Sequence, residues 1–220
     1  MLGSKIETHH WPFPQKTEML GQYATLEPLS VMHHADLWAA AASSPESFTY
    51  LRYGPFETAT ALTDLLLDLS SRADRPFRAV LDRDGKARGW LSICDVSQTG
   101  GAFEIGSIWF APSLLGTRAA HEAIFVLICL GMGTLDYERL VWRCQAQNAK
   151  SFKAAINLGF CHEGTWRHAA VAKAWQRDIA WFSIPRDEWP ACRAAFVEWL
   201  LEANFDAAQK QKHRLQDLRA

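Results

Sequence analysis

The chain has 220 residues, of which 49% are hydrophobic and 21% are charged, and its formal net charge is −1. This balance is typical of a globular protein with a sizeable core, and it excludes the strongly basic character of many nucleic-acid-binding proteins. The longest apolar run, residues 123–132, is too short to cross a bilayer, and residues 1–10 lack the pattern of a secretory signal. We therefore expect a cytoplasmic protein that binds neither membrane nor nucleic acid.

The N-terminal third is predicted to hold one strand and two helices. Residues 1–20 are polar and contain prolines, which favours an arm on the surface. A short strand at 21–29 precedes a helix that Ser30 caps and that ends near residue 42. An aromatic connector, residues 42–56, leads to a helix over 57–72, where leucines recur at helical spacing on one face: Leu62, Leu65, Leu66 and Leu69.

The remainder of the chain alternates strands and helices. The turn sequence DRDG, residues 82–85, predicts a hairpin between two apolar runs, and a third strand follows at 102–111. Further on we expect a buried helix from Thr117 to Gly133, a strand at 138–147, and a short helix at 151–160 that Ser151 caps. A hairpin over 161–184 and a helix over 186–203 complete the predicted elements.

This order of elements predicts one mixed α/β domain over residues 21–204, with a mostly antiparallel central sheet and flanking helices. Residues 1–20 form the N-terminal arm, and residues 205–220 form a polar, basic tail that we expect to be solvated or frayed. The ten tryptophans fit core packing, or alternatively the lining of an aromatic cleft.

The stretch EIGSIWFAPSLLGTRAAHEA, residues 104–123, is the most informative part of the sequence. Gly116 and Thr117 stand where a strand gives way to a helix, and no acidic residue follows until Glu122. Free N–H groups and the helix dipole make such a helix start a candidate phosphate site, although an ordinary cap fits equally. Gly106 interrupts the preceding strand, which indicates a bulge or a close approach to the main chain.

Taken together with three further segments, this stretch resembles the GNAT superfamily of acyl-CoA-dependent N-acyltransferases, in its RimJ/RimL-like branch. The other segments are TLEPL, RLVWRCQAQNAKSFKAAINLGFCHEG and RDIAWFSI, so the resemblance covers about residues 20–200. It implies a GNAT fold whose central strands splay apart, acetyl-CoA as cosubstrate, and acetyl transfer to a primary amine. That amine would be a protein N-terminus, such as that of a ribosomal protein, or a small amine or amino acid. A homodimer is plausible for the family.

The resemblance also implies which residues bind acetyl-CoA. The main chain at the helix start would hold its pyrophosphate, and the two splayed strands would hold its pantetheine arm. Leu115 and Arg118 depart from the family pattern, which has Gln or Arg at the first position and Gly at the fourth. The expected cofactor-binding residues are Ile108, Trp109, Phe110, Leu115, Gly116, Thr117, Arg118, Ala119, Ala120, Asn148 and Ser151.

For catalysis, the resemblance implies Ser151 as the proton donor to the sulfur, although a serine at a helix start is commonly a cap. Glu104 is the candidate base, with a salt-bridged glutamate as the alternative. The acceptor pocket is expected between the connector and the last hairpin, and its candidate residues are Tyr50, Tyr53, Trp166 and His168, with core packing as the alternative.

Other signals in the sequence are weak. HEAIF, residues 121–125, lacks the second histidine of a zinc helix, so no metal site is predicted. The five cysteines stand singly, which favours small buried thiols over disulfides. The departures at Leu115 and Arg118 leave one alternative to an enzyme, which is a catalytically silent CoA-binding or interaction protein with the same fold.

Overall fold

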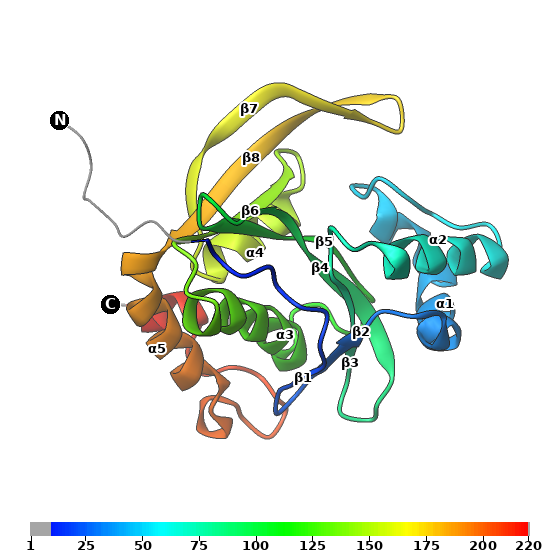
Figure 1. The fold of residues 1–220 in the computed structure, drawn as a ribbon. Coiled ribbons are helices and arrows are strands. Elements are labelled where there is room, and N and C mark those ends of the chain that lie inside the picture. The colour runs from blue at the N-terminus through cyan, green and yellow to red at the C-terminus, as the bar shows by residue number, and fades with distance from the viewer. Residues whose placement is uncertain (1–9, 220) are drawn as a thin grey trace.

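The structure of the protein, a computed structural model, describes residues 10–219, which form an eight-stranded sheet with helices on both faces (Figure 1). In the sheet the strands lie in the order β1-β2-β3-β4-β5-β6-β8-β7, and only the pair β5–β6 is parallel. This confirms the predicted mixed α/β class with a mostly antiparallel sheet. The strands are β1 (Met19–Leu20), β2 (Thr25–Pro28), β3 (Phe77–Leu81), β4 (Ala87–Ser97), β5 (Ala102–Phe110), β6 (Arg139–Gln145), β7 (Cys161–Ala172) and β8 (Trp175–Pro185).

Helices cover both faces of the sheet. Figure 1 shows α1 and α2 on one side of the sheet and α3 and α5 on the other. The α-helices are α1 (His34–Ala42), α2 (Ala59–Ser71), α3 (Arg118–Ile128), α4 (Ala149–Asn157) and α5 (Trp189–Leu200). A π-helical turn, Cys129–Thr134, continues α3. No helix of the described chain is long and apolar enough to span a membrane.

The two faces of the sheet carry two separate hydrophobic cores. Neighbouring residues of a strand point to opposite faces, so β4 contributes to both cores. Trp90 packs in the core beneath α1 and α2, whereas Leu91 packs in the core beneath α3, α4 and α5. Both side chains are fully buried. The strand β4, in the middle of the sheet, is therefore packed on both faces.

The parallel strands β5 and β6 are in register only at their beginnings. Ala102, Phe103 and Glu104 pair with Arg139, Leu140 and Val141, and no pairing follows although both strands continue. On its other side, β6 pairs with β8 along its whole length. The central strands therefore splay apart, as the resemblance implied.

A bulge in β5 accompanies this separation. The register of β4 against β5 runs from Ser92–Gly106 to Trp90–Trp109, so three steps along β5 face two along β4. Ser107 at the bulge has φ +51°, in the left-handed region. The predicted irregularity next to Gly106 is thus confirmed, and it turns β5 away from β6.

The start of α4 differs from the prediction. The helix begins at Ala149, and Asn148 is its N-cap, because the Asn148 side chain accepts the N–H of Ser151 at 3.1 Å. Ser151 therefore lies within the first turn and does not cap the helix. Asn and Ser are comparable caps, so the sequence alone could not separate the two positions.

Both chain ends pack on the domain where the structure describes them. In the arm, Trp11 is 2% exposed, and its indole donates to the carbonyl of Asp136 at 2.7 Å; residues 1–9 lie outside the described residues. In the tail, Leu215 is 3% exposed, and Arg219 donates to the carbonyl of Ile156 at 2.8 Å. Residues 206–214 are exposed, as expected of a solvated tail, but the buried Leu215 and the Arg219 hydrogen bond hold the end of the described chain against the helices.

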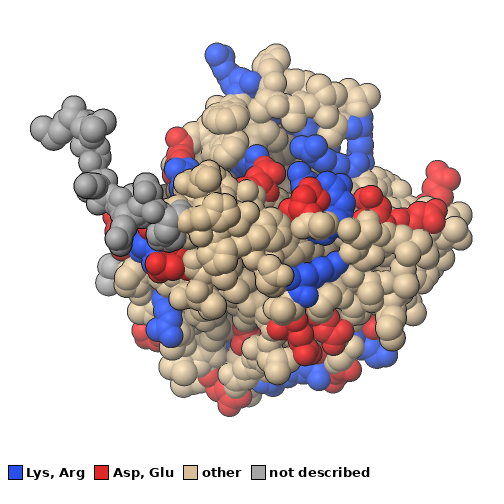
Figure 2. Space-filling model, viewed as in Figure 1, with Lys and Arg blue, Asp and Glu red and all other residues tan. Residues whose placement is uncertain are grey.

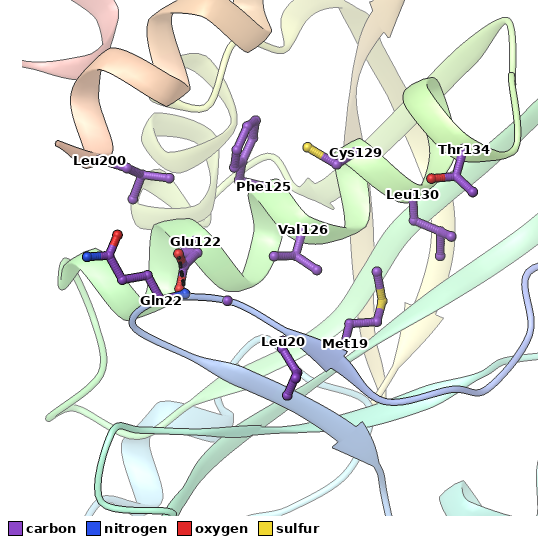
Figure 3. A pocket seen from close by; sticks show the side chains of 11 residues that line it. Met19, Leu20, Gln22, Glu122, Phe125, Val126, Cys129, Leu130, Thr134 and Leu200 are labelled. Carbon is purple, nitrogen blue, oxygen red and sulfur yellow. Dashed lines mark hydrogen bonds between the residues drawn. The ribbon is translucent and has the colours of Figure 1, made fainter.

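A buried carboxylate on α3 holds the turn between β1 and β2. Glu122 is 6% exposed and accepts the main-chain N–H groups of Gln22, Tyr23 and Ala24 at 2.9, 2.6 and 2.8 Å. Figure 3 shows Glu122 at one end of a largely apolar groove of about 460 Å³ between this turn and α3. The groove lies on the α3 side of the sheet, away from the opening between β5 and β6.

We predict that Glu122→Ala lowers the free energy of unfolding by about 3 kcal/mol or more, because buried N–H groups lose a charged acceptor. Glu122→Gln keeps one acceptor oxygen and should lose less. Urea denaturation measures both variants, with Glu198→Ala, at an exposed position of α5, as the control. Equal stability of the Glu122→Ala and Glu198→Ala variants would contradict the anchoring role.

Candidate active site

The loop between β5 and α3 forms a helix start of the kind that binds anions. Thr117 is the N-cap of α3: its Oγ1 accepts the N–H of Ala120 at 3.2 Å and donates to the carbonyl of Leu114 at 2.7 Å. Gly116 has φ +74°, and a Cβ there would meet nothing within 4 Å. The main chain at Gly116 is therefore open to a bound group.

Main-chain donors at this helix start are free. The carbonyls of Ala111 and Leu114 take the N–H groups of Leu114, Leu115 and Thr117. The N–H groups of three residues have no acceptor within residues 10–219: Gly116, Arg118 and Ala119. Three free donors next to the positive end of a helix dipole can hold a phosphate without any side chain.

The Arg118 side chain points to other partners. Its guanidinium donates to the Tyr23 hydroxyl at 2.7 Å and to the Gln209 side chain. It also lies 4.4 Å from the centre of the Tyr23 ring and 3.8 Å from that of Phe205. The structure thus uses Arg118 to tie α3 to the β1–β2 turn and the tail, while Leu115 is 52% exposed beside the open loop.

The remaining predicted residues on β5 contribute main chain and packing. The Trp109 indole stacks on Phe48 at 5.0 Å and donates to Ser47 at 2.9 Å, so its side chain belongs to the core. Phe110 packs in the opposite core and Ile108 is half-buried beside it. The main-chain N–H of Ala111 donates to the carbonyl of Arg88 on β4. Because neighbouring N–H groups of a strand point in opposite directions, the N–H of Phe110 is directed to the other side, toward β6.

Asn148 and Ser151 lie at the end of β6, on the opposite side of the opening. Ser151 Oγ accepts the indole N–H of Trp142 at 3.1 Å. The side-chain oxygen of Asn148 accepts the main-chain N–H of Ser151, and this bond fixes the first turn of α4. The structure therefore holds the Ser151 hydroxyl against β6 by the bond from Trp142, and the Ser151 main chain by the bond to Asn148.

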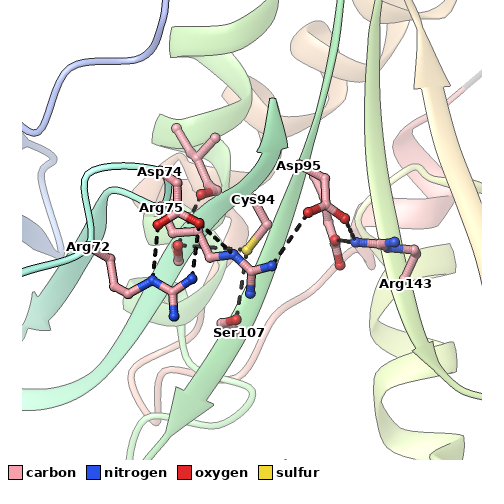
Figure 4. A network of polar contacts seen from close by, with 10 residues as sticks. Arg72, Asp74, Arg75, Cys94, Asp95, Ser107 and Arg143 are labelled. Atoms are coloured by element: carbon pink, nitrogen blue, oxygen red, sulfur yellow. Dashed lines mark hydrogen bonds and ion pairs between the residues drawn. The ribbon is translucent and has the colours of Figure 1, made fainter. Parts of the chain in front are cut away.

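Glu104 stands at the last position where β5 pairs with β6. It shares the side chain of Arg143 with Asp95. Arg143 Nε donates to Glu104 Oε2 at 2.8 Å, and Nη2 contacts both carboxylates. Figure 4 shows Asp95 between Arg143 and Arg75. Glu104 is 8% exposed, and this burial raises the pKa of its carboxyl while the ion pair with Arg143 opposes the shift.

The two oxygens of Glu104 have different surroundings. Oε2 accepts from Arg143, whereas Oε1 accepts no hydrogen bond from the described residues. A Cβ at Gly106 would lie 2.7 Å from Oε1, so only glycine there leaves the carboxylate in place. The salt-bridged state was the alternative for Glu104, and the structure shows it at one oxygen only.

A cleft of about 590 Å³ adjoins this network. Three of the four predicted acceptor residues, Tyr50, Tyr53 and Trp166, line it, but His168 does not. His168 is exposed on β7, and its main-chain N–H donates to the Asp178 carboxylate at 2.7 Å. The Tyr53 hydroxyl accepts the Trp90 indole N–H at 2.9 Å, and burial raises the pKa of this phenol. The connector and the last hairpin thus meet across one cleft, as expected.

Sequence reasoning identified Glu104 but missed the other charged residues of this cleft. Figure 2 shows basic and acidic side chains gathered beneath the overhanging β7–β8 hairpin. The lining includes five arginines and three acids: Arg52, Arg72, Arg75, Arg143, Arg177, Asp68, Asp95 and Glu104. Of the missed residues, only Arg143 gave a signal in the sequence, because it alternates with the buried residues of β6. Within residues 10–219, no cluster of three or more His, Cys, Asp or Glu side chains could hold a metal ion.

Comparison with known proteins agrees with this geometry. Residues 24–161 match the acetyltransferase (GNAT) domain family. A GCN5-related N-acetyltransferase from Brucella melitensis has a crystal structure that superposes with a TM-score of 0.94, at 36% identity over 97% of this chain and 98% of that one.

Two further relatives are more distant. A probable acetyltransferase of the GNAT family from Chromobacterium violaceum is 33% identical, with a TM-score of 0.80 over 86% of this chain and 98% of that one. The N-acetyltransferase p20 of Bacillus licheniformis, described as uncharacterized, is 26% identical over 163 residues, which are 72% of this chain and 90% of the relative. With its splayed strands, its open helix start and this family match, the chain belongs to the GNAT acetyltransferases.

Proposed function

We propose that the protein transfers the acetyl group of acetyl-CoA to a primary amine by direct attack in a ternary complex. The observation that carries the proposal is the early end of the β5–β6 register, which leaves an opening between the helix start and the acceptor cleft. A linear cosubstrate can lie in that opening with its phosphates at α3 and its thioester beside Glu104. The RimJ/RimL-like assignment and a protein N-terminus as acceptor rest on the sequence resemblance alone.

The residues of the opening fit this cosubstrate. The free N–H groups of Gly116, Arg118 and Ala119 would hold the pyrophosphate, and the Phe110 N–H, which strand alternation directs toward β6, would bond to the pantetheine arm. When bound, acetyl-CoA supplies an activated acyl carbon and a thiol leaving group. The departures at Leu115 and Arg118 do not oppose binding, because the donors are main-chain groups that any side chain leaves in place.

The two candidate catalytic residues divide the proton transfers. Glu104 Oε1 would accept a proton from the amine, so that its nitrogen can form the new C–N bond. As the C–S bond breaks, the Ser151 hydroxyl would give its proton to the departing sulfur and regain one from solvent. Trp142 donates to the Ser151 oxygen and so leaves the hydroxyl proton available for transfer. Main-chain N–H groups of β5 would stabilise the negative charge on the acyl oxygen.

A second candidate is a catalytically silent CoA-binding protein with the same fold. It is favoured by one observation, the engagement of Arg118 with Tyr23 and Gln209, which withdraws a cation from the helix start. Location in the cytoplasm and assembly into a homodimer stay predictions.

Thermal unfolding with and without acetyl-CoA tests cosubstrate binding. A ligand that binds only the folded state adds about 2.7 kcal/mol of stability at a hundredfold excess over Kd. We expect a clear rise in Tm with acetyl-CoA and none with adenosine, which lacks the pyrophosphate. No rise at millimolar acetyl-CoA would contradict the proposed site, whereas binding without turnover on an amine panel would favour the silent alternative.

Glu104→Gln should lower kcat/KM by roughly 10²-fold or more, the usual contribution of a general base. The base acts when ionised, so activity should rise with pH through the pKa of Glu104, which burial places above the ordinary carboxyl range. We expect the variant to lose that acidic limb of the pH profile. Asp95→Asn removes the other acid partner of Arg143 and should keep the limb; an unchanged profile in Glu104→Gln would exclude Glu104 as the base.

Ser151→Ala should reduce kcat by about 10²-fold or less, because the thiolate is a good leaving group that needs a proton only late. The KM for acetyl-CoA should change little. Steady-state kinetics across pH measures both, and Cys161→Ala, an exposed position outside the cleft, is the control. If kcat of the Ser151→Ala variant matches the native value at every pH, another group donates the proton.

A further inference from the structure

The charges of the acceptor cleft are not balanced along its length. At the Glu104 end, Arg143 pairs with Glu104 and Asp95, and Arg75 lies 3.6 Å from Asp95. At the other end, Arg52 and Arg177 line the same cleft, and neither has an acidic partner within residues 10–219. One end of the cleft is therefore neutralised and the other carries an excess of positive charge.

Arg177 is built into the wall of this cationic end. It lies on β8 and is only 7% exposed. Its Nη1 donates to the carbonyl of Tyr50 at 2.8 Å, which fixes the plane of the guanidinium. Its Nε is buried without an acceptor in the described residues, and Nη2 has no protein acceptor there either. Nη2 is thus the guanidinium donor left to face the cleft, and a small shift that uncovers Nε would complete the pair of donors that binds an oxyanion in two parallel hydrogen bonds.

Two neighbouring cations increase the charge at this point. Burial lowers the pKa of Arg177, and the nearby charge of Arg52 lowers it further. Lys173 reaches the carbonyl of Phe48 at 2.9 Å, and its pKa is lowered by burial and then by Arg177. A buried cation beside other cations is costly unless an anion is bound.

A further unpartnered donor lies on the same strand. The indole N–H of Trp181 is buried without an acceptor within residues 10–219, and Trp181 lines the cleft together with Arg177. Its ring packs against Trp166 at 4.3 Å between centroids. Trp181 lies beside Arg143, whose guanidinium is 4.8 Å from the centre of its ring, so this donor belongs to the Glu104 end of the cleft. Arg177 therefore carries the buried donor of the cationic end that lacks an acceptor within the described residues.

We propose that the acceptor is a small amine that also carries an oxyanion, a carboxylate or a phosphate, which binds Arg177 with the help of Arg52. The inference rests on the proposed acetyl transfer and names its substrate class. The amine would lie toward Glu104 and the anion toward Arg177, so one molecule would span the two ends of the cleft. Of the two acceptor classes left open by the sequence, this favours an amino acid or a phosphorylated amine over a protein N-terminus, whose α-carboxyl is part of a peptide bond and carries no charge.

Matched acceptor pairs test the proposal. Glycine, β-alanine and γ-aminobutyrate are compared with their amides, and aminoethyl phosphate is compared with ethanolamine, with rates expressed per concentration of unprotonated amine. Loss of one partner of a buried charge pair costs about 30-fold or more in binding, so we expect kcat/KM to favour the anionic member by that factor. The carboxylate and phosphate series separate the two anions, and the chain-length series gives the span of the cleft.

Variants assign the effect to the cationic end. Arg177→Gln and the exposed Arg52→Gln should raise KM for the anionic acceptors by a larger factor than for the neutral members. Arg177→Lys keeps the charge but loses the paired donors and should restore activity only partly. Arg167→Gln, which removes an exposed charge from the same hairpin outside the cleft, is the control and should behave as the native protein.

Binding of the same probes to the CoA-saturated protein, measured by calorimetry, separates the two proposals. Arginine-dependent binding of anionic probes without turnover would support the anion site and contradict acetyl transfer to these amines. Turnover with equal kcat/KM for charged and neutral members, or an equal loss for both in Arg177→Gln, would overturn the anion site and leave acetyl transfer intact. Absence of any difference between anionic and neutral probes in both assays would also overturn it.

Discussion

The proposed chemistry depends on the point at which β5 and β6 stop pairing. A continuous parallel ladder would satisfy the main-chain groups of both strands and leave nothing for a ligand to bond. The ladder ends after Glu104 because the bulge at Ser107 turns β5 toward β4, while β6 is held along its whole length by β8. Each strand therefore keeps its other neighbour: β6 pairs with β8 along its whole length, and β5 pairs with β4 on both sides of the bulge.

Because the opening is made by the main chain, the side chains around it are free to take other roles. The donors of Gly116, Arg118 and Ala119 are fixed by the Thr117 cap and by the start of α3. Arg118 can then join the β1–β2 turn to the tail by its contacts with Tyr23 and Gln209. A departure from the family pattern at this position changes the packing of the domain without removing the donors.

The elements were predictable from the sequence where a local period or a turn defines them. The DRDG hairpin, the leucine face of α2 and the alternation of β6 are set by residues that are close together in the chain. The resemblance led us to expect an acceptor pocket between the connector and the last hairpin, and the structure has a cleft there, whose role as acceptor site stays a prediction.

What the sequence left open depends on partners far away in the chain. Glu122 bonds to N–H groups about a hundred residues earlier, and Arg177 bonds to Tyr50, so neither role leaves a local pattern. Leu215 in a polar tail carries no periodic signal, although it is buried. The misassigned cap of α4 has a different origin, because Asn148 and Ser151 are both good caps and only the first helical residue decides between them.

The division of charge along the cleft also explains how a buried carboxylate can remain useful. An unpaired Glu104 would be held neutral by burial, while one with both oxygens bound to arginine would have no oxygen left to accept a proton. Here Arg143 binds Oε2, and Gly106 leaves room beside Oε1. Asp95 also pairs with Arg143, so the positive charge of Arg143 is shared between two carboxylates and stabilises the charge on Glu104 only in part. The same cleft keeps its uncompensated cations at Arg52 and Arg177, away from this pair. A substrate with an amine at one end and an anion at the other would meet a complementary charge at each end, and only one orientation in the cleft would satisfy both.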